Sequence, residues 1–437
     1  MDNEREVRDC LAKKISGSIV GLWLLVAEHL RLGSWDLLKA WTGEDDRAIA
    51  PRMAMQLVHE SALCVNRIRK KENIAHQGFE LINGLPWVAS DEQIHKLLND
   101  HTVMEAMQLQ ESLTKLRNNA GHYDQNKIWA IDPHRLISAT QRITPKKKKR
   151  PGEPSQKTLQ TFFCLDTQTG QPLIFNCGTA GKTVTTATLS FLSSLQRAMP
   201  KQRGESPALL LADAEHFSKE LLEHVADNDH YDFVLPVPMT KKIKKHFPQL
   251  SYQRKWAGYA IATTTYKFEG SDKEFGLIVQ RDGEREHEYS YKAFITKSLT
   301  DITEKISEKY SDRWSIEEFF NFEQAMGWKR ASTLNLNIRY GKMSLALIAQ
   351  AAMYQLRQKL PTPYKIWTAE HLAKTIFNSL DGDIRVRNDR IIVTIYNAPK
   401  HLNFPDYYSN LPSKLIQEGI NPAIPWLYDF KLDFVFK

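Results

Sequence analysis

The chain has 437 residues, of which 42% are hydrophobic and 25% charged, a composition typical of a globular protein with two or three domains. Its 59 Lys and Arg residues outnumber its 51 Asp and Glu residues, and the net charge of +8 favours polyanionic partners without requiring one. No apolar run is long enough to span a membrane, the start lacks a basic signal-peptide region, and the four cysteines show no zinc-binding spacing. We therefore expect a cytoplasmic protein with reduced thiols.

Residues 1–122 predict a helical domain. Apolar residues recur every three or four positions in segments 34–43, 52–71 and 91–121, with caps expected at Ser34 and Asp91 and a stop at Gly121. This helical domain is interpreted either as a nucleic-acid-binding domain with a helix-turn-helix or as a plain packing domain.

Residues 123–238 predict a mixed sheet flanked by helices. The expected order is a strand at 127–137, a hairpin at 158–178, a helix at 185–199, a strand at 207–217, a helix at 218–228 and a strand at 231–238. The loop 142–157 between the first strands contains five consecutive basic residues, Lys146 to Arg150. Strand patterns then fill 239–297, which we interpret as an inserted β-rich domain.

The last third of the chain returns to helices. Segments 299–327 and 341–360 have helical periodicity, and we assign residues 298–360 to the same core as 123–238. Residues 361–437 form a separate C-terminal region with a predicted hairpin at 382–397. A strand-rich hairpin followed by alternating helices and strands is the layout of an RNase H-like α/β core.

Three acidic residues occupy the positions that would carry catalysis in such a core. Asp132 and Asp213 end or interrupt apolar strands, where an unpaired carboxylate is unfavourable, and Glu317 lies on the late helix. Carboxylates suit two hard divalent cations, Mg²⁺ or Mn²⁺, that assist phosphodiester cleavage. Each residue taken alone also has a structural explanation, as a turn cap, a helix cap or a solvated side chain. The three together predict a metal-binding catalytic set.

Asp166 is an alternative to Asp132 as the first acid, because it also follows an apolar strand. It opens the turn "DTQTG", where Asp is favoured for local hydrogen bonding, so we prefer Asp132. His134 and His216, close to the two aspartates, are interpreted as structural hydrogen-bonding residues.

The stretch "YSDRWSIEEFF" places Tyr310, Arg313 and Glu317 three and four residues apart, on one stripe of a helix. Such a stripe is either a solvated face or a phosphate-binding arginine beside a metal-binding carboxylate. The same spacing selects Glu317 over its neighbour Glu318, which lies about 100° further round a helix.

With these motifs the sequence resembles the DDE transposases of bacterial insertion sequences, in the group with a Tyr-Arg-Glu-Lys signature. Tyr310, Arg313 and Glu317 match that signature in register, but its lysine position holds Gln324, and Lys329 is the nearest candidate to replace it. The resemblance implies an enzyme that cuts transposon-end DNA and joins it to target DNA, acting as a homodimer on the nucleoid. Open alternatives are a nuclease of the same core without strand transfer and a non-catalytic DNA-binding protein.

The resemblance also implies DNA contacts outside the acidic set. The inserted domain would hold transposon-end DNA, and Trp256 is a candidate to stack on an unpaired base, although we favour a core position for it. The basic runs that include Lys146, Lys147 and Lys148, and the run Lys241 to Lys245, are expected to be exposed and to add salt-dependent affinity for DNA.

Overall fold

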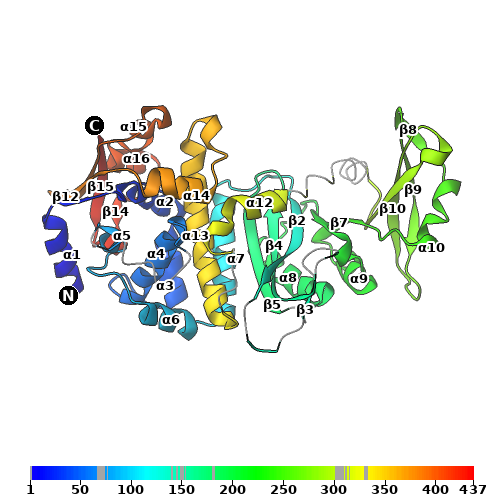
Figure 1. Cartoon of the computed structure of the whole chain (residues 1–437), viewed down its shortest axis with the longest axis horizontal. Coiled ribbons are helices and arrows are strands. Elements are labelled where there is room, and N and C mark those ends of the chain that lie inside the picture. The colour runs from blue at the N-terminus through cyan, green and yellow to red at the C-terminus, as the bar shows by residue number, and fades with distance from the viewer. Residues whose placement is uncertain are drawn as a thin grey trace. The chain divides into compact units, whose positions relative to one another are not determined.

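The computed structural model describes residues 2–65, 74–75, 77–138, 141–143, 146–147, 152, 154–179, 183–300, 310, 313, 315–328 and 333–437 (Figure 1). The chain divides into two compact units. Unit 1 comprises residues 1–120, 138–140 and 320–437, and unit 2 comprises residues 121–137 and 141–319. No helix in the described ranges has both the length and the hydropathy needed to cross a membrane.

Unit 1 is built around one long helix, α13 (Leu336–Lys359). Its middle residues are buried on every side, which is the pattern of a helix enclosed by other helices. The N-terminal helices of the unit are α1 (Asp2–Ala12), η1 (Val20–Trp23), α2 (Leu24–Leu32), α3 (Ser34–Thr42), α4 (Ile49–Ala62), α5 (Phe79–Ile82), α6 (Asp91–Asp100) and α7 (Val103–Asn119). Helices α2, α4, α6 and α7 pack against α13, so residues 320–360 of the segment 298–360 that we assigned to the core belong to unit 1, and its residues 298–319 belong to unit 2.

Side-chain caps define two of these helices. The Ser90 hydroxyl accepts a hydrogen bond from the Gln93 backbone and begins α6, and Thr102 with Glu105 forms a second capping box that begins α7. The segment 91–121 is therefore two helices and not the single helix that its periodicity predicts. The predicted caps at Ser34 and Asp91 are each the first residue of a helix, one position after the actual cap.

A five-stranded sheet among the described residues completes unit 1. Its order is β1 (Ile15–Gly17), β12 (Gly382–Arg387), β13 (Arg390–Ile395), β15 (Phe430–Phe436) and β14 (Ala423–Ile424). The predicted hairpin at 382–397 is confirmed as β12 and β13. The remaining short helices are η7 (Gln324–Met326), η8 (Thr362–Tyr364), α14 (Ala369–Leu372), η9 (Ala373–Phe377), η10 (Lys400–Leu402), α15 (Phe404–Tyr408), α16 (Leu411–Gln417) and η11 (Pro425–Leu427).

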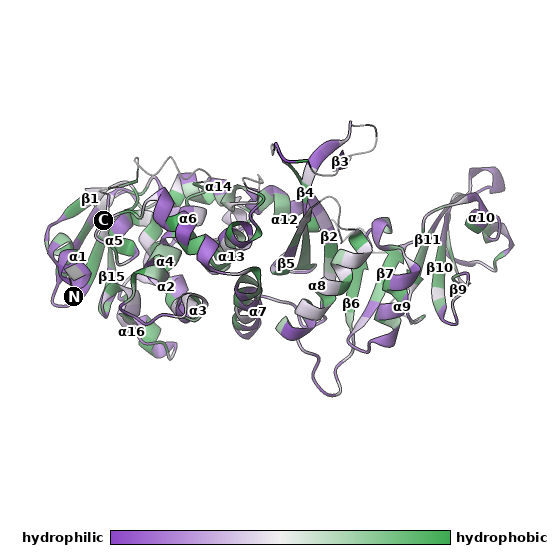
Figure 2. Ribbon diagram, turned by 90° about the horizontal axis from the view of Figure 1, so that it is seen from below, coloured by the Kyte–Doolittle hydropathy of each residue, from purple (hydrophilic) through white to green (hydrophobic). Residues whose placement is uncertain are grey.

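Unit 2 contains the mixed sheet that the sequence predicts. Its elements are β2 (Ile128–Ile137), β4 (Gln156–Asp166), β5 (Pro172–Thr179), α8 (Val184–Ala198), β6 (Ala208–Ala212), α9 (Lys219–Asp227) and β7 (Tyr231–Pro236), which confirms the predicted order of elements. Strand β2 pairs antiparallel with β4 and parallel with β6, and β6 pairs parallel with β7. Strand β5 is largely apolar and residues 158–166 of β4 (Figure 2) are all buried, because both faces of this part of the sheet are covered.

The strands after residue 238 continue this sheet. They are β8 (Gln253–Trp256), β9 (Tyr259–Lys267), β10 (Glu274–Asp282) and β11 (Ser290–Thr296), with α10 (Lys241–Lys244), η4 (Phe247–Gln249) and η5 (Glu286–Glu288) between them. Strand β11 pairs with β7, so the described strands form one ten-stranded sheet that also includes the short β3 (Lys146–Lys147). The β-rich segment is therefore joined to the core through backbone hydrogen bonds.

The four cysteines form no disulfide within the described structure. Cys164 and Cys177 are buried, as expected, whereas Cys10 and Cys64 are partly exposed. The helix predicted over 299–327 appears in the described residues only as α12 (Ser315–Glu323) and η7, and residues 301–309, 311, 312 and 314 lie outside that description.

Candidate active site

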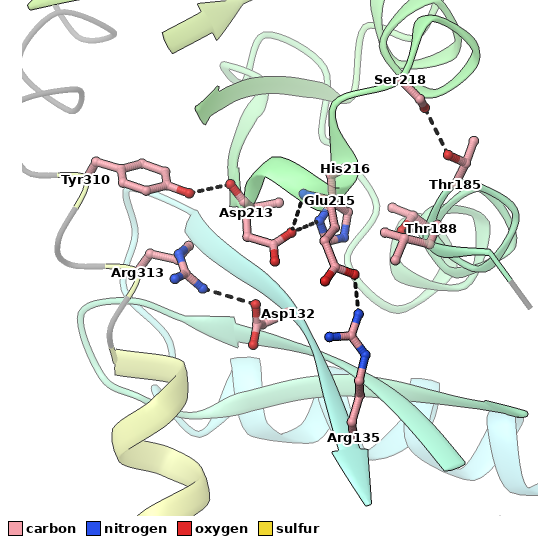
Figure 3. A network of polar contacts seen from close by, with 12 residues as sticks. Asp132, Arg135, Thr185, Thr188, Asp213, Glu215, His216, Ser218, Tyr310 and Arg313 are labelled. Carbon is pink, nitrogen blue, oxygen red and sulfur yellow. Dashed lines mark hydrogen bonds and ion pairs between the residues drawn. The ribbon is translucent and has the colours of Figure 1, made fainter. Parts of the chain in front are cut away.

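The parallel register of β2 and β6 brings the two predicted aspartates together. Ile131 of β2 pairs with Ala212 of β6, and the next residues in the two strands are Asp132 and Asp213. Neighbouring strands lie about 4.8 Å apart, so the two carboxylates start from adjacent backbones. Figure 3 shows both side chains entering the same space beyond the paired part of the strands.

Asp132 has one cationic partner. Arg313 Nη1 lies 3.0 Å from Asp132 Oδ1, and the side chains are 17% and 19% exposed, respectively. Burial raises the pKa of Asp132 to about 7, against the opposing effect of Arg313, and the negative charges of Asp213 and Glu317 add to the increase. Asp132 is therefore a mostly buried carboxyl group whose surroundings contain too little positive charge.

Asp213 is held by the turn that follows it. The turn η3 (Ala214–His216) directs two donors at Asp213 Oδ1: the Glu215 backbone nitrogen at 3.0 Å and His216 Nδ1 at 2.8 Å. Burial raises the pKa of Asp213, but the hydrogen bond from His216 and the charges of His216 and Arg313 outweigh it and hold this pKa below its ordinary value. The two neighbouring aspartates thus have pKa values shifted in opposite directions.

Glu317 lies in the first turn of α12 and is partly buried, whereas Glu318 is exposed. Because the charge of Glu317 raises the pKa of Asp132, Glu317 is electrostatically coupled to the aspartate pair. Among the described residues, no three His, Cys, Asp or Glu side chains are close enough together to hold a metal ion. Arg313, and not a third carboxylate, is the group in contact with Asp132.

Tyr310 and Arg313 each have 3-10 helical backbone conformation and come before the described start of α12, while residues 311, 312 and 314 lie outside the description, so the predicted continuous stripe stays a prediction. Tyr310 donates a hydrogen bond to the Ala212 carbonyl and packs against Phe294, with ring centroids 5.0 Å apart. The Arg313 guanidinium lies 5.9 Å from the centre of the Tyr310 ring. Tyr310 therefore contacts the end of β6 and Arg313 contacts β2 (Figure 3).

An ion pair that the sequence did not reveal ties the turn to β2. Arg135 of β2 pairs with Glu215 of η3, so the segments that carry Asp132 and Asp213 are connected by side chains as well as by the sheet. Nothing in the local sequence marks this pair, because its members are 80 residues apart. The position of His216, three residues after Asp213, was a usable signal, and its interpretation as a structural hydrogen-bonding residue agrees with its contact with Asp213.

The alternative first acid, Asp166, is fully buried in the turn after β4. It accepts hydrogen bonds from the backbone nitrogens of Asp124, Gln168 and Thr169 and from the Thr169 hydroxyl. These contacts account for an aspartate at this position without a catalytic role.

The structure gives mixed results for the predicted DNA contacts. Trp256 is 55% exposed and stacks on Tyr259 with ring centroids 4.1 Å apart, so the core position that we favoured is wrong. Lys146 is exposed in β3, which is purple in Figure 2, and the lysines of the run Lys241 to Lys245 are exposed as predicted. Lys147 is described only by its backbone pairing with β4, and Lys148 and Lys329 lie outside the described residues.

Comparison with known proteins identifies the family. The family model "Transposase DDE domain" matches residues 97–351, more than half of the chain. The chain belongs to the DDE transposase family. The matched region contains Asp132, Asp213 and Glu317.

A solved structure with some similarity is a cryo-EM structure of the piggyBac transposase synaptic complex with hairpin DNA. It is 12% identical in sequence, with 81% of this chain and 79% of that chain covered and a TM-score of 0.44. No curated protein sequence matches the chain.

Proposed function

We propose that this member of the DDE transposase family cuts the ends of a transposon and joins the freed 3′-hydroxyl to target DNA. The observation that carries the proposal is the parallel register of β2 and β6, which sets Asp132, in the middle of β2, beside Asp213, directly after the end of β6. Glu317 is the third acid, since its charge acts on Asp132. The mixed strand order, with one antiparallel hairpin followed by parallel strands, supports an RNase H-like core.

The donor set fits divalent metal ions. Asp132, Asp213 and Glu317 supply only carboxylate oxygens, which Mg²⁺ and Mn²⁺ prefer, and the raised pKa of Asp132 reflects a local deficit of positive charge that a cation would correct. Asp132 and Asp213 would hold the ions, and Glu317 would have to move closer to complete the set, because the three carboxylates do not form a metal-binding group in the described arrangement. Bound ions would supply the Lewis acidity that activates an attacking oxygen and stabilises a leaving oxygen.

The residues around the acids have separate tasks in this proposal. Arg313 would exchange the Asp132 carboxylate for a phosphate oxygen of the DNA, since a guanidinium binds both anions well. His216 keeps Asp213 in one orientation, and Tyr310 fixes the end of β6 on which Asp213 depends. In the first reaction, water attacks the phosphorus atom and the bond to the 3′-oxygen breaks. In the second, that 3′-hydroxyl loses its proton and attacks a phosphorus atom of the target, whose bond to its own 3′-oxygen breaks, so the displaced target strand leaves with a 3′-hydroxyl.

The finer assignments follow from the sequence signature. Tyr310, Arg313 and Glu317 favour the bacterial insertion-sequence group, with Gln324 as a departure and Lys329 as the candidate replacement. We expect a homodimer that acts on the nucleoid in the cytoplasm. Trp256, exposed on β8, is the candidate to stack on an unpaired base near the transposon end.

The test compares two adjacent glutamates. Glu317→Gln removes a proposed ligand and should lower divalent-dependent cleavage of transposon-end DNA by at least about 10³-fold, the scale expected for a group needed in the transition state. Glu318→Gln is the matched control and should cleave within about threefold of the unchanged protein, because surface substitutions away from a site have small effects. DNA binding of both variants, measured by gel shift, should be retained.

Three outcomes separate the alternatives. Cleavage without joining of the 3′-hydroxyl to a target plasmid would show that the protein is a nuclease without strand transfer. If the unchanged protein bound transposon-end DNA without cleaving it, the protein would be a non-catalytic DNA-binding protein. Normal cleavage by Glu317→Gln with loss in Glu318→Gln would show that the acid has been assigned one residue too early.

A further inference from the structure

The two faces of the unit-1 sheet carry very different side chains. Ile391 and Val393 of β13 and Leu432 and Phe434 of β15 are buried in the core of the unit. Successive residues of a strand point to opposite faces, so the residues between them face away from that core. Three of these outward residues, nearest the turn between β12 and β13, are Arg387, Arg390 and Lys431, which we call the basic row.

The members of the basic row lie directly opposite one another. Arg387 pairs with Arg390 across the antiparallel β12–β13 ladder, and Arg390 pairs with Lys431 across the parallel β13–β15 ladder. All three side chains are exposed. Strands are about 4.8 Å apart, so three positive charges occupy a line about 10 Å long. Like charges directly opposite in a sheet destabilise it, which makes this arrangement unfavourable in the isolated sheet.

The surrounding charges do not compensate for the repulsion. Arg390 Nη1 lies 3.8 Å from Asp433 Oδ2, a long ion pair. Within the described residues, Arg387 and Lys431 form no ion pair, and neither does the exposed Asp389 in the turn beside them. Arg385, the preceding outward residue of β12, adds a further cation opposite Ile392. The second ion-paired carboxylate on this face, Asp383, is at the other end of β12 and is paired with Lys14, so the end of the sheet that holds the basic row retains an excess of positive charge.

We propose that the basic row binds the sugar-phosphate backbone of duplex DNA without reading its sequence. A line of two arginines and a lysine can contact successive phosphates, and arginine forks bind phosphate oxygens in pairs. An exposed sheet face favours an extended polyanion over a small anion, and three cavities of the described structure, of about 970, 1150 and 20 Å³, are lined by other residues. The choice of DNA rests on the proposed function, and the contact would hold DNA of any sequence, including target DNA.

The experiment measures salt dependence with the full chain. Affinity for a random-sequence duplex of about 30 base pairs is measured between about 50 and 300 mM salt for the unchanged protein and for the triple variant R387Q/R390Q/K431Q. Each phosphate contact contributes about 0.9 to the slope of log affinity against log salt, so the triple variant should lose about 2 to 3 from that slope. The control variant K96Q/K115Q/K365Q removes the same charge from exposed positions elsewhere in unit 1 and should change the slope by less than about 1.

Thermal unfolding provides an independent readout. If the row repels itself, R387Q/R390Q/K431Q should unfold at the same or a higher temperature than the unchanged protein in low salt, and should gain less from added salt. An unchanged slope, an equal change in the control, or a lower unfolding temperature of the triple variant would each overturn the proposal. Its failure is distinguishable from failure of the proposed function, because Glu317→Gln should abolish cleavage without altering the salt slope.

Discussion

Buried carboxylates are neutralised differently in the two units. In unit 1, the fully buried Glu28 receives hydrogen bonds from Arg31 at 3.1 Å and Tyr408 at 2.7 Å, and an ion pair with Lys359 completes its set of partners. In unit 2, Asp132 has Arg313 as its cationic contact while Asp213 and Glu317 add negative charge nearby. A buried carboxylate whose charge is fully paired has a structural role. A buried carboxylate whose surroundings contain too little positive charge indicates a site where a cation or a substrate is expected to bind.

The largest expected effect tests the unit-1 side of this comparison. Glu28→Gln leaves Lys359 in a buried position without its negative partner and should lower the free energy of unfolding of unit 1 by about 3–5 kcal/mol. Urea denaturation measures the change. The control is Glu418→Gln, which removes a more exposed partner of Arg31 and should cost at most about 1 kcal/mol. If Glu28→Gln lowered the free energy of unfolding by less than about 1 kcal/mol, the contacts of Glu28 with its partners would not be needed for stability.

The second effect concerns Asp132 and pH. Its pKa is about 7 in the folded protein and about 3.9 in an unfolded chain, so the folded state holds the proton more tightly and stability is lost as the pH rises between these values. In metal-free buffer, Asp132→Asn should therefore be more stable than the unchanged protein at pH 8 by about 2–4 kcal/mol, with a smaller gain at pH 5.

Asp213 provides a control of opposite sign. Its folded pKa is lowered, so its charge contributes stability that is present above the unfolded pKa and is lost as the pH falls through the folded value. Asp213→Asn should consequently be less stable than the unchanged protein at pH 8. If both substitutions shifted the urea midpoint in the same direction, the two aspartates would not differ in the way that we infer.

The smallest expected effect concerns how Asp213 is oriented. His216 donates from Nδ1, and an asparagine side-chain nitrogen can occupy nearly the same position, whereas a glutamine nitrogen corresponds to Nε2. Substituting residues that orient metal ligands reduces metal affinity by about 10–100-fold. We expect this loss of Mn²⁺ affinity, measured by calorimetry without DNA, in His216→Gln and a loss of at most about threefold in His216→Asn. Equal losses in both variants would assign His216 to packing alone.

The order of elements in unit 2 was predictable because each strand is a compact apolar run bounded by turn residues. The positions of the two aspartates could be predicted for the same reason, since each aspartate interrupts an apolar run. The exact register of the strands, which places Asp132 beside Asp213, comes from long-range backbone pairing that no local pattern encodes.

Other features depend on contacts between distant segments. The periodicity of 299–327 predicted one helix carrying Tyr310 and Arg313, and both residues have helical conformation, but no periodicity could reveal that Tyr310 contacts the end of β6 and Arg313 contacts β2. Trp256 was expected in the core of the inserted domain, yet it is 55% exposed on β8, the edge strand of the sheet formed by the described strands. Local propensity does not distinguish edge strands from central ones.

The pairing of β1 with β12 affects how the protein is made. Residues 15–17 find their sheet partners at residues 382–384, and the parallel neighbour of β13 ends at Phe436. During synthesis, the first strand and the helices that follow it emerge from the ribosome long before this sheet can form, whereas all of unit 2 is available earlier. Unit 2 can thus fold before β15, the last strand of unit 1, has been synthesised. An mRNA truncated near its 3′ end would encode a chain that contains the acidic residues of unit 2 but cannot complete the sheet of unit 1.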